Sequence, residues 1–322
     1  MMMGPGLPPT RGAATKGAGV PTVAVVLHRK KVREKKNGTG HGTTRAAVRE
    51  VFLAAGVDLL WYEVPKSRKA RKKARKAVTK GADVVVAWGG DGTVQRCVDA
   101  LAGRDAALAV IPAGTSNLLA TALGLPDDPA DAARVALDGA RRRLDTGSVN
   151  GEHFAVVAGA GLDALLVADA DRELKGRIGR AAYVYSGLKH LGDDAFEADV
   201  EVDGERVFRG RATSVLVANL PGGVGGLGLS DASSADDGVL EIGVVTAEGP
   251  LQLVRTAARA LLGGADASPH VTTSDGAGVV VQLGRAVPYE LDGGEREPAR
   301  LLEIGVHPAS ITVCVPAPAA GS

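Results

Sequence analysis

The segment at residues 83–94, which reads DVVVAWGGDGTV, constrains the fold of this chain more than any other. Its apolar, β-branched run predicts a buried parallel strand, and the glycines that follow predict a tight turn into a helix over residues 93–101. Gly89, Gly90 and Gly92 have no Cβ atom, so a ligand can approach the backbone closely here. A helix N-terminus adds free N–H groups and the positive end of a dipole. The segment therefore predicts a phosphate-binding turn.

An anionic side chain, Asp91, lies in the middle of this turn, where a bound phosphate would be. A Mg²⁺ ion between carboxylate and phosphate would reconcile the two negative charges, because Mg²⁺ takes oxygen ligands and keeps several waters. The structural alternative is a tight β–α turn in which the aspartate caps a helix. The turn lacks the Lys-Ser/Thr ending of a P-loop and the spacing of a dinucleotide fingerprint. This segment alone therefore does not distinguish a phosphate site from a structural turn.

A second strand, turn and helix follow, over residues 108–111, 112–117 and 118–123. Thr115, Ser116 and Asn117 place hydroxyl and amide groups at the start of the helix. They can cap the helix, bind a nucleotide, or do both. Two successive polar turns at the same edge of a parallel sheet predict a cleft there.

Residues 66–80 predict a basic amphipathic helix, because its few apolar side chains, Ala70, Ala74, Ala77 and Val78, fall on one face. The cationic face is either solvated or attracted to an anionic membrane surface. The whole chain carries a net charge of only +1 and is 3% aromatic, which argues against a nucleic-acid partner. Its richness in Ala, Gly, Val and Arg is typical of bacterial genomes with a high GC content.

The length of 322 residues predicts two domains. The pattern changes near residue 147, where short strands and turn glycines replace the strand–helix alternation, and this favours an antiparallel β domain. Residues 1–20 predict a disordered tail. The uncharged glycine-rich loop at 221–228 is either a lid on an apolar substrate or a disordered connection.

Nothing in the sequence indicates a signal peptide, and the uncharged segment 106–126 is interrupted by turn residues, so we expect a cytoplasmic protein. Cys97 and Cys314 predict single buried thiols. The histidines show no metal-ligand spacing.

Two late groups of carboxylates are candidates for chemistry. Asp231, Asp236 and Asp237 precede a strand at 239–246 and form either a cation site or an acidic surface turn. Asp292 and Glu295 lie in a hairpin turn, and one of them could take a proton from an alcohol.

Together these segments resemble the diacylglycerol kinase catalytic-domain family, which is related to sphingosine kinases and, more distantly, to NAD kinases. Four blocks in order carry the resemblance from residue 21 to residue 316. They are GGDGT at 89–93, IPAGTSN at 111–117, AGAGLD at 158–163, and DGVL at 237–240 with the late Asp292 and Glu295.

The resemblance implies an α/β nucleotide-binding domain over residues 21–146 and a C-terminal antiparallel β-sandwich, the lipid-substrate domain, over 147–316. The last segment could return to the first domain, and 317–322 form a tail. It implies an ATP-dependent lipid kinase of phospholipid biosynthesis that transfers the γ-phosphate to diacylglycerol or a related lipid alcohol. The expected place is the cytoplasm or the inner face of the membrane, and a homodimer is left open.

The resemblance also implies roles for residues. The phosphates of ATP would lie on Gly89, Gly90, Asp91, Gly92, Thr93, Val94 and Gln95, and the nucleotide would contact Gly114, Thr115 and Asn117. Asp91 would organise the nucleotide Mg²⁺ through water. Ser234, Asp237 and Val239 would hold a structural Mg²⁺. Glu295 would accept the proton of the lipid hydroxyl, with Asp292 beside it.

Three positions depart from the family pattern. The family has Asp-Gly-Glu where this chain inserts Gly294, so either Asp292 or Glu295 could be the base. Gln95-Arg96 replace a glutamate after the first block, and the first strand leads into His28-Arg29-Lys30 in place of Asn-Pro. A small-molecule kinase of the NAD kinase type, or a non-catalytic nucleotide-binding regulator, remain the alternatives.

Overall fold

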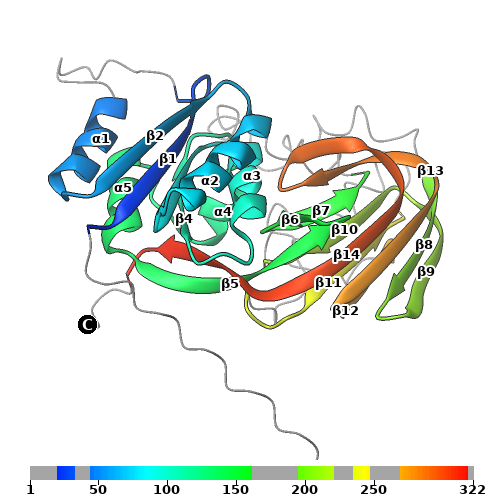
Figure 1. Cartoon of the computed structure of the whole chain (residues 1–322). Helices are drawn as coiled ribbons and strands as arrows, with labels where there is room; N and C mark the ends of the chain where they lie inside the picture. The colour runs from blue at the N-terminus through cyan, green and yellow to red at the C-terminus, as the bar shows by residue number, and fades with distance from the viewer. Residues whose placement is uncertain (1–19, 33–43, 162–194, 221–234, 247–268, 318–322) are drawn as a thin grey trace, which may run out of the picture.

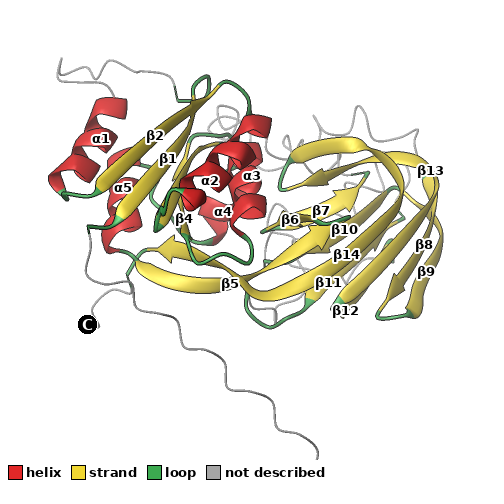
Figure 2. Ribbon diagram, in the orientation of Figure 1, coloured by secondary structure: helices red, strands yellow, loops and turns green. Residues whose placement is uncertain are grey.

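The computed structural model describes residues 20–32, 44–161, 195–220, 235–246 and 269–317. An α/β lobe and a lobe of strands lie side by side (Figure 1), and the helices of the described residues all belong to the first lobe (Figure 2). This arrangement confirms the predicted fold class of an α/β domain followed by an antiparallel β domain.

The first lobe contains four parallel strands in the order β2 (Asp58–Val64), β1 (Thr22–His28), β3 (Val84–Gly89) and β4 (Ala107–Pro112). β1, β3 and β4 are buried almost throughout because their Val, Ala, Leu and Ile side chains face helices on both sides. The strands run in parallel, so the turns after β1, β2, β3 and β4 all lie at one edge of the sheet. The two predicted polar turns are therefore neighbours.

Among the described residues, five helices pack on this sheet, and a short 3₁₀ helix, η1 (Ser67–Lys69), precedes the second of them. Ala70, Ala74 and Ala77 of α2 are fully buried, as expected for a basic helix that packs through a narrow alanine stripe. The five helices are α1 (Thr44–Ala54), α2 (Ala70–Thr79), α3 (Asp91–Leu101), α4 (Leu118–Ala122) and α5 (Pro129–Asp138).

The second lobe is built from antiparallel strands around one apolar cluster that includes Phe154, Val217, Ile242 and Leu291. Its strands are β5 (Ala140–Val149), β6 (Glu152–Phe154), β7 (Val157–Ala160), β8 (Phe196–Val202), β9 (Glu205–Ala212), β10 (Ser214–Ala218), β11 (Leu240–Val245), β12 (Val271–Gly276), β13 (Gly278–Leu291) and β14 (Gly294–Val315).

The last strand, β14, connects the lobes. It pairs with β13 through a two-residue hairpin loop at Asp292 and Gly293, and then with β5. Near its end it joins the parallel sheet, where Val313 pairs with Leu108 of β4. One mixed sheet thus passes through both lobes and fixes the hairpin relative to the turns after β3 and β4.

Some local expectations were wrong. The run Arg141-Arg142-Arg143 predicts a basic turn after a helix, but these residues begin β5, because β14 supplies a partner strand for them. The sequence pattern predicts four separate strands near 278–283, 287–291, 301–306 and 311–315. In the structure the first two are the single strand β13 and the last two are the single strand β14, each with register shifts. The sequence also predicts one strand at 154–158, and the structure splits this segment between β6 and β7.

Other expectations fall on residues outside those described. They are the tail before residue 20 and the loop at 221–228. The sequence also predicts a polar loop at 32–43, of which only residue 32 is described, and helical segments at 164–191 and 250–263.

Candidate functional site

The turns after β3 and β4 meet backbone to backbone. A Cβ atom added at Gly114 would lie 2.7 Å from the Cα of Gly90, and one added at Gly90 would lie 3.0 Å from the Cα of Gly114. Neither position can carry a side chain without displacing the other turn. The two predicted blocks therefore form one surface, with glycine on both sides of the contact.

Helix α3 begins at this contact with Gly90 as its N-cap, and no side-chain hydrogen bond caps it. The N–H groups of Thr93 and Val94 bond to the carbonyl of Gly90 at 2.8 and 3.2 Å. The first N–H groups of a helix have no partner within the helix. The start of α3 is thus suited to bind an anion.

Asp91, in the first turn of α3, caps the neighbouring helix α4. Its Oδ1 accepts the N–H of Leu118 at 2.6 Å, and its Oδ2 accepts the N–H of Asn117 at 3.0 Å. The capping alternative is therefore realised, but across the turn contact and towards another helix. Carboxylate oxygens are acceptors of the kind that bind the waters of a Mg²⁺ ion. The donor set fits Mg²⁺ held through water.

The other residues predicted to bind the nucleotide differ in whether their side chains are exposed at the turn. Thr115 is exposed on the turn. The side chain of Asn117 closes its own loop through the N–H and C=O of Gly114, at 2.8 and 3.3 Å. Val94 and Gln95 are buried, and Gln95 bonds to β6, so neither presents its side chain to the turn. Thr93 is buried as well, with its Oγ1 3.1 Å from the Oγ of Ser67.

Asp292 lies at the tip of the β13–β14 hairpin with φ +45°, followed by Gly293 with φ +70°, as a tight Asp-Gly hairpin turn requires. It is 4% exposed, and its carboxylate accepts the N–H groups of Ala155, Val156 and Val157 at 2.8–3.0 Å. Burial raises the pKa of Asp292 to about 6; these hydrogen bonds lower it, and the nearby negative charge of Asp91 raises it. The structure therefore places these two predicted carboxylates within electrostatic range of each other.

Glu295, the other predicted proton acceptor, is exposed. The hairpin loop consists of Asp292 and Gly293, and Leu291 pairs with Gly294, so Gly294 occupies the position directly after Asp-Gly. Glu295 is one residue further along β14, and its side chain points to the face opposite that of Arg296. The inserted glycine thus moves the glutamate to the other face of the hairpin.

The predicted structural metal set is only partly described. Asp237 is exposed, and its Oδ1 accepts the N–H of Val239 at 3.0 Å, while Ser234 lies outside the described residues. Within the described ranges, no group of three or more His, Cys, Asp and Glu side chains could hold a metal ion. One carboxylate and one carbonyl fit part of a Mg²⁺ site, and the set stays a prediction.

Sequence reasoning missed a group of polar side chains between the lobes: Glu152 of β6 and Arg296 of β14, which bind Gln95 and Arg96 of α3. Nearby, Asp99 of α3 accepts the N–H of His153 and pairs with Arg71. The unusual Gln95-Arg96 pair was the only local signal of this contact.

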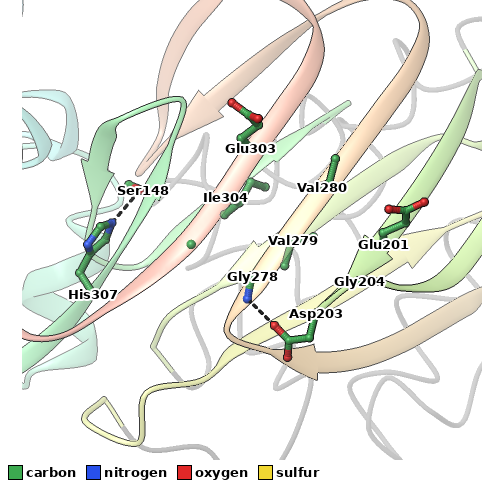
Figure 3. A pocket seen from close by; sticks show the side chains of 11 residues that line it. Ser148, Glu201, Asp203, Gly204, Gly278, Val279, Val280, Glu303, Ile304 and His307 are labelled. Atoms are coloured by element: carbon green, nitrogen blue, oxygen red, sulfur yellow. Dashed lines mark hydrogen bonds between the residues drawn. The ribbon is translucent and has the colours of Figure 1, made fainter.

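A cavity of about 430 Å³ lies elsewhere, on the strand lobe (Figure 3). Ser148, Asp203, Glu303 and His307 line it, and the Nε2 of His307 lies 2.8 Å from the Oγ of Ser148. None of the predicted site residues lines this cavity, so it carries no part of the site described above.

Family models cover most of the chain. The model described as the diacylglycerol kinase catalytic domain matches residues 32–149, and that of the YegS C-terminal NAD kinase beta sandwich-like domain matches residues 155–315. The chain belongs to the diacylglycerol kinase catalytic-domain family. The family recognised from the four sequence blocks is thereby confirmed.

Members of this family align over most of the chain. The diacylglycerol kinase of Bacillus subtilis (strain 168) is 32% identical over 77% of this chain and 83% of its own length. A protein of Pseudomonas aeruginosa (strain UCBPP-PA14) named "Probable lipid kinase YegS-like" is 32% identical over 92% of this chain and 94% of its own.

Solved structures of other proteins share the fold. A diacylglycerol kinase from Bacillus anthracis str. Sterne superposes with a TM-score of 0.69 at 22% identity, over 94% of this chain and 98% of the other. An NAD kinase from Archaeoglobus fulgidus in complex with ATP superposes with a TM-score of 0.50 at 14% identity, over 91% and 93%. Among the described helices, none is both long and apolar enough to cross a membrane.

Proposed function

We propose that this protein transfers the γ-phosphate of ATP to the hydroxyl of diacylglycerol or a related lipid alcohol. The observation that carries the proposal is the placement of Asp292, a carboxylate whose pKa burial raises to about 6, within electrostatic range of Asp91 on a glycine-lined turn at a helix N-terminus. A base with a pKa close to the working pH is suited to accept the proton of an alcohol.

Phosphoryl transfer needs positioning and electrostatic stabilisation more than covalent chemistry by the protein. The start of α3 would bind the phosphates, Thr115 would contact the nucleotide, and Asp292 would take the hydroxyl proton. Mg²⁺, held through water by Asp91, would neutralise charge on the phosphates. A second, structural Mg²⁺ would bind Asp237 with carbonyls of Ser234 and Val239.

The names of the relatives support a lipid acceptor, since one is a diacylglycerol kinase and another is named a lipid kinase. The proximity of Asp292 to Asp91 argues against a non-catalytic regulator, which would have no need of a base beside the phosphate turn. The NAD kinase alternative shares the fold, and its substrate has to be tested directly.

The direct test offers labelled ATP to the protein with vesicles that contain diacylglycerol. We expect label in phosphatidic acid when Mg²⁺ is present, and none in NADP when NAD replaces the lipid. Label transferred to NAD would contradict the lipid kinase proposal in favour of a kinase of the NAD kinase type. Label transferred to neither acceptor while ATP still binds would contradict it in favour of a non-catalytic regulator.

The exposed face of α2 and η1 supports peripheral binding at an anionic membrane, on the cytoplasmic side. Arg71 pairs with Asp99, and Lys73 lies 5.4 Å from the ring centroid of Tyr62. The exposed cations of the segment are Lys66, Arg68, Lys69, Lys72, Arg75, Lys76 and Lys80. Ser67 contacts Thr93, so this face adjoins the phosphate turn.

Neutralising Lys72, Arg75 and Lys76 to glutamine will weaken binding to vesicles rich in phosphatidylglycerol. At about 1 kcal/mol per basic residue, three charges correspond to a roughly 100-fold loss. Cosedimentation measures the partitioning, and its loss in 0.5 M salt in the parent protein is the expected companion result.

The matched control neutralises Arg206, Arg209 and Arg211, exposed residues of β9, and removes the same total charge. An equal loss in both triple variants would show that only net charge matters, and that α2 is not the docking face.

A further inference from the structure

Two side chains that no sequence motif indicated, Arg296 and Glu152, meet between the lobes. The Nε of Arg296 donates to Oε2 of Glu152 at 3.0 Å, and its Nη2 donates to Oε1 at 2.6 Å. This is a two-point guanidinium–carboxylate pair, which fixes orientation as well as distance. The side chains are only 10% and 19% exposed, so water screens the pair little.

The same pair is bound to helix α3. Nη2 of Arg296 donates to Oε1 of Gln95 at 2.8 Å, and Nε2 of Gln95 donates to Glu152 at 3.1 Å and to the carbonyl of His153 at 2.7 Å. Arg96 adds a further ion pair to Glu152. Asp91 begins the helix that carries Gln95 and Arg96, so this contact ties the phosphate turn to β6.

Arg296 also holds the hairpin. Its Nη1 donates to the carbonyls of Gly294 and Glu295, at 2.7 and 3.0 Å. At the tip, Asp292 is bonded to the three N–H groups that follow β6. β6 therefore holds the hairpin at two points, through Glu152 and through the segment after Phe154.

We propose that Arg296 and Glu152 are positioning residues that set the distance between the phosphate turn on α3 and the proton acceptor on the hairpin. This inference rests on the proposed phosphoryl transfer, because positioning matters only if a proton moves to Asp292. The chain of contacts runs from Asp91 along α3 to Gln95, on to Glu152 and Arg296, and then along the hairpin.

The charges make Glu152 the centre of the group. Two guanidinium groups share its single carboxylate. Burial by itself raises the pKa of Glu152, but Arg296, Arg96 and Gln95 outweigh this and lower it. Glu152 thus stays ionised, and its removal leaves two facing cations that push α3 and the hairpin apart.

The test compares Arg296→Gln, Arg296→Lys and Glu152→Gln with the parent protein. We expect Arg296→Gln to lower kcat about 10- to 100-fold, as displaced reacting groups do, while the KM for ATP stays within about threefold. Lysine keeps the charge but loses the two-point contact, so Arg296→Lys should recover part of kcat. If Arg296→Gln does not fold, Arg296→Lys and Glu152→Gln carry the comparison.

Arg206→Gln is the control, since Arg206 forms exposed ion pairs with Asp199 and Glu201 in the same lobe. It should leave kcat unchanged. A substitution at Arg296 that lowers the melting temperature but keeps kcat and the pH profile would overturn the proposal, because the pair would then be merely structural.

A second readout needs no substrate. The titration of the Asp292 carboxyl is followed by NMR in the full chain, with Asp292→Asn for assignment. It depends on the burial of the carboxyl, on its hydrogen bonds to the segment after β6 and on how close Asp91 lies. Arg296→Gln should move that titration, and an unmoved titration would contradict the positioning role. If the parent protein phosphorylates no lipid, the proposed function fails, whereas this titration still decides whether the pair positions Asp292.

Discussion

Replacing Asp91 by asparagine will lower kcat by about 10²- to 10³-fold, the loss typical of removing one preorganised charge from a transition-state site. The reason is the place of the carboxylate at the start of α3, where the two glycine turns meet and the phosphates would bind. Asparagine has nearly the same shape but cannot supply the negative charge that a hydrated Mg²⁺ needs. Steady-state kinetics with saturating ATP and diacylglycerol measures the effect.

The capping role of Asp91 makes a stability effect certain as well. In the parent protein the backbone N–H groups of Asn117 and Leu118 each donate to one oxygen of the Asp91 carboxylate. Asparagine keeps one acceptor oxygen, so its NH₂ group faces one of these two N–H donors. The loss of such a cap costs about 1 kcal/mol. The melting temperature of Asp91→Asn should therefore fall by a few degrees without loss of the folded state.

Asp128→Asn is the matched control. Asp128 caps α5 through the N–H groups of Ala130 and Asp131, away from the turn contact. Because one oxygen of Asp128 accepts both N–H groups and asparagine caps a helix as well as aspartate does, this variant should lose less stability than Asp91→Asn and keep full activity. If Asp91→Asn behaves in the same way as Asp128→Asn, with activity intact, then Asp91 is a cap only and its assignment to the nucleotide metal is wrong.

The comparison of these two aspartates shows what the sequence can reveal. The strand, glycine turn and helix around Asp91 follow from local patterns: a β-branched run, three glycines, and a helical segment. The partners of Asp91 do not, because Asn117 and Leu118 come 26 and 27 residues later and approach it only once β3 and β4 pair in parallel. Local pattern located the site but not its hydrogen bonds.

The long strands show the same limit. The break predicted between residues 306 and 311 reflects real local irregularity, since the register shifts between His307 and Ile311. The strand nevertheless continues, because β5 provides hydrogen-bond partners on both sides of the irregularity. The sequence does not predict the contact that Glu152 makes, because a single glutamate in a three-residue strand forms no pattern. Its partner, Arg296, lies 144 residues away.

Asp292→Asn will lower kcat by about 10²- to 10⁴-fold, the usual contribution of a general base, whereas Glu295→Gln will stay within about threefold of the parent. Asp292 is the carboxylate that interacts with Asp91, and Glu295 is exposed on the opposite face of the hairpin strand from Arg296, which faces α3. The two variants are assayed side by side, with ATP binding measured in each to confirm that the phosphate turn is intact.

The pH dependence separates the same two residues. A base whose pKa burial raises to about 6 is protonated as the pH falls through 6, so kcat/KM of the parent should decline below that pH. Glu295→Gln should keep this decline. Stability should change in the opposite direction, because the pKa of Asp292 is higher in the folded than in the unfolded chain. Its favourable contribution is complete below about pH 4 and is lost as the pH rises through about 6.

Asp292→Asn should also destabilise the folded protein, because the carboxylate of Asp292 accepts three N–H groups after β6. An asparagine leaves one of them facing an amide donor, at a cost of about 1–3 kcal/mol. Activity must therefore be compared at a temperature where the variant is fully folded. If folded Asp292→Asn retains kcat and Glu295→Gln loses it, then Glu295 is the base. In that case Asp292 would only hold the hairpin to the segment after β6 through hydrogen bonds, and its raised pKa would reflect burial alone.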